Sequence, residues 1–147
     1  MKLESTRNID LIVLHCSDTY SHMDIDVSVI NDWHRARGWS GCGYHFFIKR
    51  DGTIETGRDL NIPGAHAYGY NKNSIGICYA GGKGDDGQPE DNRTNEQKRA
   101  LAALLINLEV EHPMVEIKGH NELSSKACPC YDVQQDLKLI DTYLFLL

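Results

Sequence analysis

The run from Ile9 to Leu14 constrains the fold of this chain more than any other segment. Apart from Asp10, it consists of leucine, isoleucine and valine, without the polar–apolar alternation of a strand that has one face in water. Such a run is typical of a strand that is buried on both faces, in a sheet covered by helices on both sides. The segment therefore predicts an interior strand of an α/β domain.

Short strands are expected at further places along the chain. Asp51-Gly52 lies between two strand-like runs, and this arrangement indicates a hairpin. Gly81-Gly82 closes a later strand. The expected strands are residues 44–49, 53–55, 74–80 and 114–118.

The first helix is expected to begin near Val27 and to end at Gly38. Val27, Ile30 and Trp33 recur at helical spacing, and the glycine supplies a C-terminal stop. This spacing predicts that Trp33 lies in the hydrophobic core. We expect His34, on the same helix, to be packed or at the surface and not to bind a metal.

Two further helices follow the polar loop at residues 84–93. Thr94 and Gln97 form a capping box ahead of leucines that are one helical turn apart. Asp132 can cap the last helix. The core-facing residues are expected to be Leu101, Leu104, Leu105 and Leu108 in one helix and Leu137, Ile140 and Leu144 in the other. Because strands and helices interleave, we expect residues 1–147 to form a single α/β domain with a central mixed β-sheet flanked by helices.

Composition and charge narrow the class of protein. The chain has 147 residues, 41% of them hydrophobic, which is enough for one domain with a core. Its net charge is −6 and no basic cluster is visible, so nucleic-acid binding is not expected. No apolar run is long enough to span a membrane, and residues 1–7 lack the apolar core of a signal peptide. We expect a monomer that is cytoplasmic at synthesis and does not insert into a membrane.

The five cysteines form no C-x-x-C framework. Cys78 lies in a strand-like run and is expected to be a small buried apolar residue. The odd number of cysteines and the missing signal peptide favour unpaired thiols in a reducing compartment. The missing redox motif argues against a thiol redox protein.

A short irregular segment places His120, Lys126 and Cys128 close together, and His15 follows the first apolar run. Imidazole and thiolate are preferred ligands of Zn²⁺, and a catalytic site uses three protein ligands and leaves a fourth position for water. The residues suggest a hydrolytic zinc centre. A structural zinc site would need a fourth protein ligand, for which only Cys130 is apparent.

Five groups of residues occur in order along the chain. They are Trp33-His34-x-x-Arg37-Gly38-Trp39, Gly43-Tyr44-His45-Phe46, Asp51-Gly52-x-Ile54-x-x-Gly57-Arg58, Gly64-Ala65-His66-x-x-Gly69-Tyr70-Asn71-x-x-Ser74-Ile75-Gly76 and Lys126-Ala127-Cys128-Pro129. Together they resemble the type 2 N-acetylmuramoyl-L-alanine amidases, which include the T7-type phage lysozymes and the animal peptidoglycan recognition proteins. The resemblance extends from about residue 9 to about residue 137.

The resemblance implies a zinc enzyme that hydrolyses the amide between the lactyl group of N-acetylmuramic acid and L-alanine in peptidoglycan. The metal ligands that it implies are His15, His120 and Cys128. The catalytic residues that it implies are Tyr44 and Lys126, and the residues along the substrate groove are His66, Tyr70 and Asn71. Zinc lowers the pKa of bound water to about 7, which makes hydroxide available for this reaction.

Two positions depart from the family pattern. Some relatives have a glutamate base where this chain has Tyr44, and a phenol of ordinary pKa, about 10, is a poor base at neutral pH. We expect Tyr44 to position the reacting groups and to stabilise charge. Cys130 stands where relatives commonly have serine or glycine. It could compete for the metal or oxidise with Cys128, but we expect it to take no part.

The sequence leaves three biological roles open. The leading hypothesis is a phage or prophage lytic amidase that reaches the wall once the membrane is permeabilised. The first alternative is a non-catalytic peptidoglycan-binding module, although such family members typically lose the metal-binding cysteine and Cys128 is present here. The second alternative is a cytosolic amidase that recycles wall fragments.

Overall fold

The centre of the molecule is a five-stranded mixed sheet with the order β4-β3-β5-β1-β7. The computed structural model describes residues 1–143. The strands of the sheet are β1 (Leu11–Cys16), β3 (Phe46–Ile48), β4 (Ile54–Thr56), β5 (Ser74–Tyr79) and β7 (Glu116–Gly119). Only the edge strand β4 is antiparallel to its neighbour, and β2 (Thr19–Tyr20) pairs separately with β6 (Gly82–Lys83). The predicted strands and the hairpin at Asp51-Gly52 are confirmed, with small shifts of the ends.

Strand β1 is the interior strand that the sequence predicts. It runs parallel to β5 on one side and to β7 on the other. Ile12, Val13 and Leu14 are buried. The strand extends further than the apolar run, to Cys16, so that His15 is part of it.

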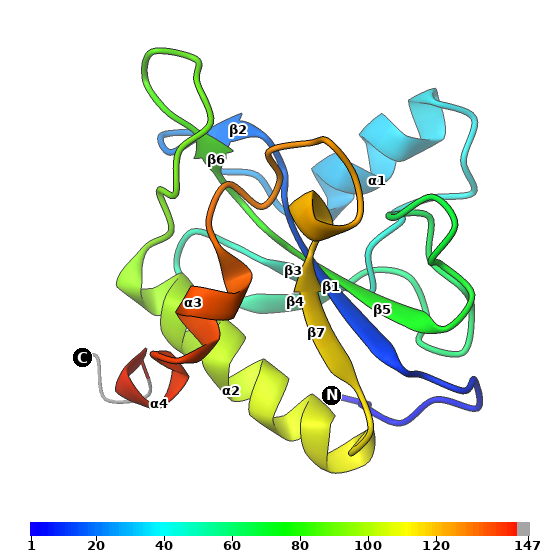
Figure 1. Ribbon diagram of the computed structural model, residues 1–147. Coiled ribbons are helices and arrows are strands. Elements are labelled where there is room, and N and C mark those ends of the chain that lie inside the picture. The colour runs from blue at the N-terminus through cyan, green and yellow to red at the C-terminus, as the bar shows by residue number, and fades with distance from the viewer. Residues whose placement is uncertain (144–147) are drawn as a thin grey trace.

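Helices cover both faces of the sheet (Figure 1). Helix α1 (Val27–Ala36) lies on one face, and α2 (Asn95–Glu111), α3 (Val133–Leu137) and α4 (Ile140–Tyr143) lie on the other. The core has two layers, one on each face of the sheet, and neighbouring residues of β3 contribute to different layers. Phe47 packs in the cluster that contains Ile30 of α1, and Phe46 packs with the leucines of α2. The α/β class with a mixed sheet and flanking helices is confirmed.

Helix α2 begins at the predicted capping box. The Thr94 hydroxyl accepts a hydrogen bond from the Gln97 backbone N–H, and the Gln97 side chain accepts one from the Thr94 N–H, each at 3.0 Å. The buried Gln97 amide also donates to the carbonyl oxygens of Ile48 and Ala80, which ties the helix to β3 and to the end of β5. The predicted core-facing residues Leu101, Leu104, Leu105 and Leu108 are all buried.

The prediction that Trp33 lies in the core is wrong, because its side chain is 39% exposed. The buried residues of α1 are Ile30 and His34. At 3.6 residues per turn, Trp33 projects roughly 80° away from the direction between these two, toward solvent. His34 is packed, as expected, and accepts a hydrogen bond from the Gly43 N–H.

The C-terminal segment forms two short helices instead of the single predicted one. Asp132 caps α3 by accepting a hydrogen bond from the Gln135 N–H, as predicted. Leu137 and Ile140 pack against the core, one on each of the two helices. Leu144, also expected to face the core, lies outside the described residues.

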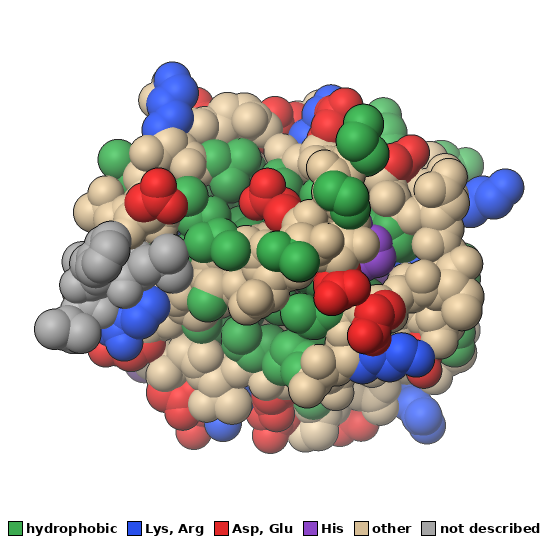
Figure 2. All heavy atoms as spheres, turned by 90° about the horizontal axis from the view of Figure 1, so that it is seen from below, with side chains coloured by type: hydrophobic (Ala, Val, Ile, Leu, Met, Phe, Trp, Pro, Cys, Tyr) green, Lys and Arg blue, Asp and Glu red, His purple; other side chains and the backbone are tan. Residues whose placement is uncertain are grey.

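The surface is acidic in keeping with the composition. Figure 2 shows one face on which acidic side chains are scattered among apolar ones, with lysine and arginine mainly at its margin. Among residues 1–143, no helix combines the length and the apolar character needed to cross a bilayer.

Arg93 makes the main buried ion pairs of the described residues. Its side chain is only 2% exposed and binds Asp91 and Asp136, each at 2.9 Å, while its guanidinium lies over the ring of Tyr131. The cation therefore joins the loop before α2 to α3 and to the segment that carries Cys128.

Replacing Arg93 by methionine should lower the free energy of unfolding by about 3 kcal/mol at pH 7, because it leaves partly buried carboxylates without their cation. Burial tends to raise the pKa of Asp91, but its hydrogen bonds with Arg93 and the charge of Arg93 outweigh this and lower it. A lowered pKa gives stability that is present above the unfolded value, about 3.9, and is lost as the pH falls through the folded value. Urea unfolding should therefore show a difference from wild type that shrinks below about pH 4.

The matching change at the exposed Arg35 serves as the control. It should alter the free energy of unfolding by less than about 0.5 kcal/mol. An equal effect of the two substitutions would contradict the importance of the buried cation.

Candidate metal centre

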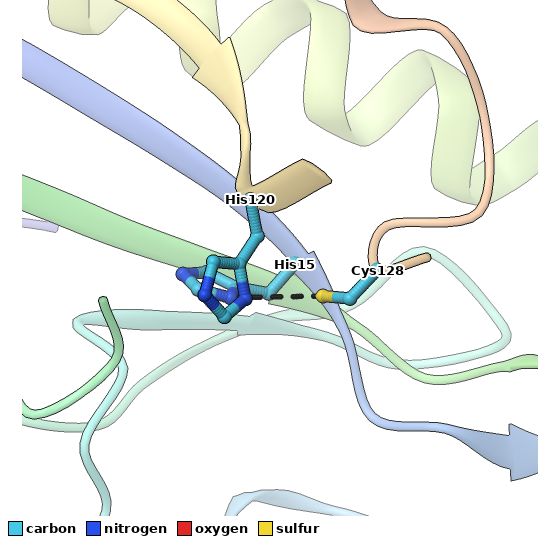
Figure 3. A group of neighbouring side chains, drawn as sticks. All are labelled: His15, His120 and Cys128. Carbon is cyan, nitrogen blue, oxygen red and sulfur yellow. Dashed lines mark hydrogen bonds between the residues drawn. The ribbon is translucent and has the colours of Figure 1, made fainter. Parts of the chain in front are cut away.

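The three predicted metal ligands meet at the carboxyl ends of two parallel strands. His15 is the penultimate residue of β1, and His120 follows β7 directly and begins the 3-10 turn η1 (His120–Glu122). The register pairs Leu14 with Gly119, so the two histidines leave neighbouring strands side by side. Cys128 arrives on the segment between η1 and α3 (Figure 3). The segment predicted to be irregular thus contains one helical turn, at His120.

The segment that carries Cys128 is held against the sheet. The Tyr79 hydroxyl donates a hydrogen bond to the Pro129 carbonyl oxygen at 2.7 Å. The Cys16 backbone N–H donates to the Cys128 sulfur at 3.2 Å. Val133, at the start of α3, is buried in the core. These contacts fix the sulfur beside the end of β1.

The geometry of the three side chains fits a zinc ion. One ligand atom from each of His15, His120 and Cys128 lies within 4.8 Å of the others. His15 Nδ1 is 3.7 Å from the Cys128 sulfur. Zn–N and Zn–S bonds of about 2.05 and 2.3 Å, at a tetrahedral angle, would place these two atoms about 3.6 Å apart. Two imidazoles and one thiolate are also a typical zinc donor set.

Burial sets the protonation of these groups. It lowers the pKa of His15, and together with the charge of Lys126 it lowers that of His120. Hydrogen bonding from Cys16 lowers the pKa of Cys128 in spite of its burial. Neutral imidazoles and an accessible thiolate are the forms that bind a metal ion.

The three ligands lie in the wall of a cleft of about 900 Å³. Among the described residues, the group of potential ligands contains no fourth member, and Cys130 is not part of it. The site therefore has the open form of a catalytic centre. The other side chains of the cleft include His34, Trp39, Tyr44, His66, Tyr68, Tyr70, Asn71 and Lys126.

Both predicted catalytic residues line this cleft. The ring of Tyr44 lies 5.1 Å from that of His15, and burial raises the pKa of its phenol well above the ordinary value. Burial thus favours the protonated phenol, which can donate a hydrogen bond. Lys126 is exposed on the segment that carries Cys128, and its charge contributes to the lowered pKa values of all three candidate ligands.

The predicted groove residues also line the cleft, but their side chains are engaged differently. Tyr70 is exposed. The Asn71 side-chain oxygen accepts the backbone N–H groups of His66 and Ala67, which shapes the loop between them. His66 uses both ring nitrogens inside the protein, with His15 at 2.8 Å and Ser74 at 3.1 Å. The structure thus leaves Tyr70 free to meet a ligand, whereas the His66 ring is already bonded.

His45 and Cys130 lie apart from the ligand group. His45 is buried away from the cleft and bonds to the backbone of Ile62 and Gly76. Cys130 lies 3.7 Å, sulfur to sulfur, from Cys16. No sequence pattern indicated this pair of thiols, because the two residues are far apart along the chain.

Comparisons with known proteins identify the family of this chain. Residues 5–131 match the family model described as N-acetylmuramoyl-L-alanine amidase. The chain belongs to this amidase family. Together with the phage endolysins that it resembles, this match shows that the chain is an N-acetylmuramoyl-L-alanine amidase that acts on peptidoglycan.

Relatives of the amidase include phage proteins. The endolysin of Klebsiella phage KP32 is 44% identical over 124 residues, which are 84% of this chain and 82% of that protein. The endolysin of Escherichia phage T7 is 41% identical over 135 residues, covering 92% of this chain and 89% of that protein. The predicted resemblance to T7-type enzymes is confirmed.

Solved structures show the same fold. The N-acetylmuramoyl-L-alanine amidase LysC from Clostridium intestinale superposes with a TM-score of 0.78 at 30% identity, covering 92% of this chain and 87% of that one. Drosophila PGRP-LB gives a TM-score of 0.74 at 23% identity, covering 97% and 86%, and this likeness supports the fold alone. The amidase thus shares its architecture with both enzymes and recognition proteins.

Proposed function

We propose that this amidase is zinc-dependent and hydrolyses the amide between the lactyl group of N-acetylmuramic acid and L-alanine, with the metal held by His15, His120 and Cys128. The observation that carries the proposal is the convergence of these three ligand atoms within 4.8 Å beside an open cleft. When bound, zinc acts as a Lewis acid that activates water and polarises a carbonyl group.

Tyr44 and Lys126, which both line the cleft, assist the reaction. The protonated phenol of Tyr44, beside His15, donates a hydrogen bond to the reacting amide or to water and so orients it. The ammonium of Lys126 offers positive charge to the oxygen that becomes negative when the carbonyl is attacked. A preorganised donor of this kind stabilises the transition state more than the ground state.

The exposed aromatic residues that line the cleft favour a long substrate that contains sugar. Trp39 and Tyr70 are exposed there, and Tyr68 is 99% exposed. Flat aromatic faces pack against apolar patches of ligands while their polar edges stay wet. We propose that Tyr70, with Asn71 shaping its loop, lies along the groove that receives the muramoyl peptide.

The proposed biological role is lysis of the bacterial wall at the end of a phage cycle. The similarity to phage proteins named endolysins, over more than four-fifths of the chain, supports it. In this role the protein acts from inside the cell, after the membrane has become permeable.

Digestion of purified peptidoglycan, with and without a chelator, tests the proposed reaction. We expect new L-alanine amino termini to appear with the untreated protein, to fall to background after zinc removal, and to return when Zn²⁺ is added. Release of reducing sugar ends without new amino groups would overturn the proposal. Full activity in the chelated, metal-free protein would overturn its zinc dependence.

A further inference from the structure

His66 contacts a candidate metal ligand on the side away from the metal position. His15 Nδ1 faces the Cys128 sulfur at 3.7 Å, so Nδ1 is the nitrogen directed at the metal. The other nitrogen, Nε2, lies 2.8 Å from His66 Nδ1. The two rings meet edge to face, at an interplanar angle of 88°. His15 is therefore held between the metal position and a second imidazole.

We propose that His66 is a positioning residue of the metal centre, which accepts the Nε2–H of His15 and thereby fixes the tautomer and orientation of that ligand. The inference rests on the proposed zinc function and deepens it. A ligand histidine commonly gives its second N–H to a carboxylate or carbonyl group, which orients the ring and increases its basicity. Here a neutral imidazole takes that place.

The proton on His15 determines which group donates and which accepts in each hydrogen bond from His15 through His66 to Ser74. If His15 offers the lone pair of Nδ1 to the metal, its proton must lie on Nε2. His66 Nδ1 must then accept, so the proton of His66 lies on its own Nε2. That N–H points at the Ser74 hydroxyl oxygen, 3.1 Å away, which accepts it. Ser74 is fully buried, so the outer end of the chain is shielded from water.

The ring of His66 is fixed by its surroundings as well as by its bonds. A Cβ atom added to Gly64 or Gly76 would come within 2.5 or 2.6 Å of His66 Cδ2, so only glycine leaves room for the ring at both places. The Asn71 side chain accepts the His66 backbone N–H at 3.0 Å. A side chain this constrained can hold His15 in one orientation before any metal binds.

The contacts of His66 favour this role over direct bonding to a substrate in the groove, where the family resemblance places the residue. Both ring nitrogens already have partners within the protein, and a neutral imidazole has one donor and one acceptor only. A substrate would have to displace His15 or Ser74 to bond with it. On this interpretation, the His66 ring lies in the wall of the cleft because it is bonded to His15.

Zinc affinity measured without substrate tests the inference. The metal-free protein is titrated with Zn²⁺ against a chromophoric chelator. His66→Ala should weaken zinc binding by about 10–100-fold, the range typical for the hydrogen-bond partner of a metal ligand. His66→Asn should recover part of this loss, because its side-chain oxygen can occupy the place of Nδ1. The thiolate-to-metal absorption of the Co²⁺ form should change in His66→Ala and less in His66→Asn.

His45 provides a matched control. It is a buried histidine whose ring centre lies 6.0 Å from that of His66. Among the described residues, its ring bonds to Arg7 and to backbone groups of Ile62 and Gly76, and to no candidate metal ligand. His45→Ala should lower the unfolding temperature yet leave zinc affinity within about twofold, because it removes no partner of a ligand.

Three results would overturn the inference. If His66→Ala keeps the wild-type zinc affinity but has a raised KM for peptidoglycan fragments, His66 binds substrate and does not position His15. An equal loss of zinc affinity in His45→Ala would mean that loosening of the core, and not the bond to His15, is responsible. Absence of zinc binding by the wild-type protein would overturn the metal centre itself and the role of His66 with it.

Discussion

Replacing Cys128 by serine should abolish turnover of peptidoglycan and remove most of the bound zinc. The thiolate is the only anionic ligand of the proposed centre, and a neutral hydroxyl is a far weaker zinc ligand. We expect zinc affinity to fall by more than about 100-fold, beyond the loss typical for the hydrogen-bond partner of a ligand. Metal content after gel filtration, measured by atomic absorption, and release of L-alanine amino termini are the two readouts.

Cys130→Ser is the matched control for this substitution. The residue lies two positions away in the same segment, but its sulfur contacts Cys16 and is outside the ligand group. The variant should keep its zinc and its activity. A Cys128→Ser protein that retains both, or a Cys130→Ser protein that loses both, would show that the ligand is misassigned. Circular dichroism should show that both variants are folded, because both cysteines pack at the edge of the core and are not among its fully buried residues.

Replacing Lys126 by alanine should reduce kcat by about 10²–10³-fold while zinc content stays at the wild-type level, the loss expected when a preorganised transition-state donor is removed. The exposed side chain contributes little to the core, so stability should change little. The structural basis is that Lys126 lines the cleft and contributes to lowering the pKa of each candidate ligand. Steady-state kinetics on a soluble muramoyl peptide, with metal analysis of the same samples, measures both quantities.

Ser125→Ala controls for disturbance of the segment itself. Ser125 is exposed beside Lys126 and is absent from the wall of the cleft. Its removal should leave kcat unchanged. If Lys126→Ala instead loses zinc, or if both variants slow the reaction equally, the lysine acts through the shape of the segment and not through its charge.

The periodic parts of the fold could be predicted from the sequence because local pattern and tertiary packing agree there. The run at Ile9–Leu14 and the capping box at Thr94 each became the expected element. Trp33 could not be placed by spacing alone, since a helix with one narrow buried stripe leaves neighbouring apolar residues exposed. The single C-terminal helix became two, which the spacing of its apolar residues did not signal.

The candidate metal ligands could be named from residue type and family resemblance, but the contacts around them could not. His15 and His120 meet because β1 and β7 are neighbours, a pairing that depends on the order of strands in the sheet. The contact between His15 and His66 joins residues 51 positions apart. No periodicity marks such a contact, so the sequence could suggest that His66 lies near the site without revealing which neighbour it serves.

The three candidate ligands come from different structural elements, and this has an evolutionary consequence. Two of them are presented by paired strands of the sheet, whose hydrogen bonds and apolar core do not involve the metal, and the third stands on a connecting segment. If Cys128 is a ligand as proposed, its substitution would abolish hydrolysis and leave the fold and the cleft in place. Proteins descended from such a variant would bind peptidoglycan in the same cleft without hydrolysing it.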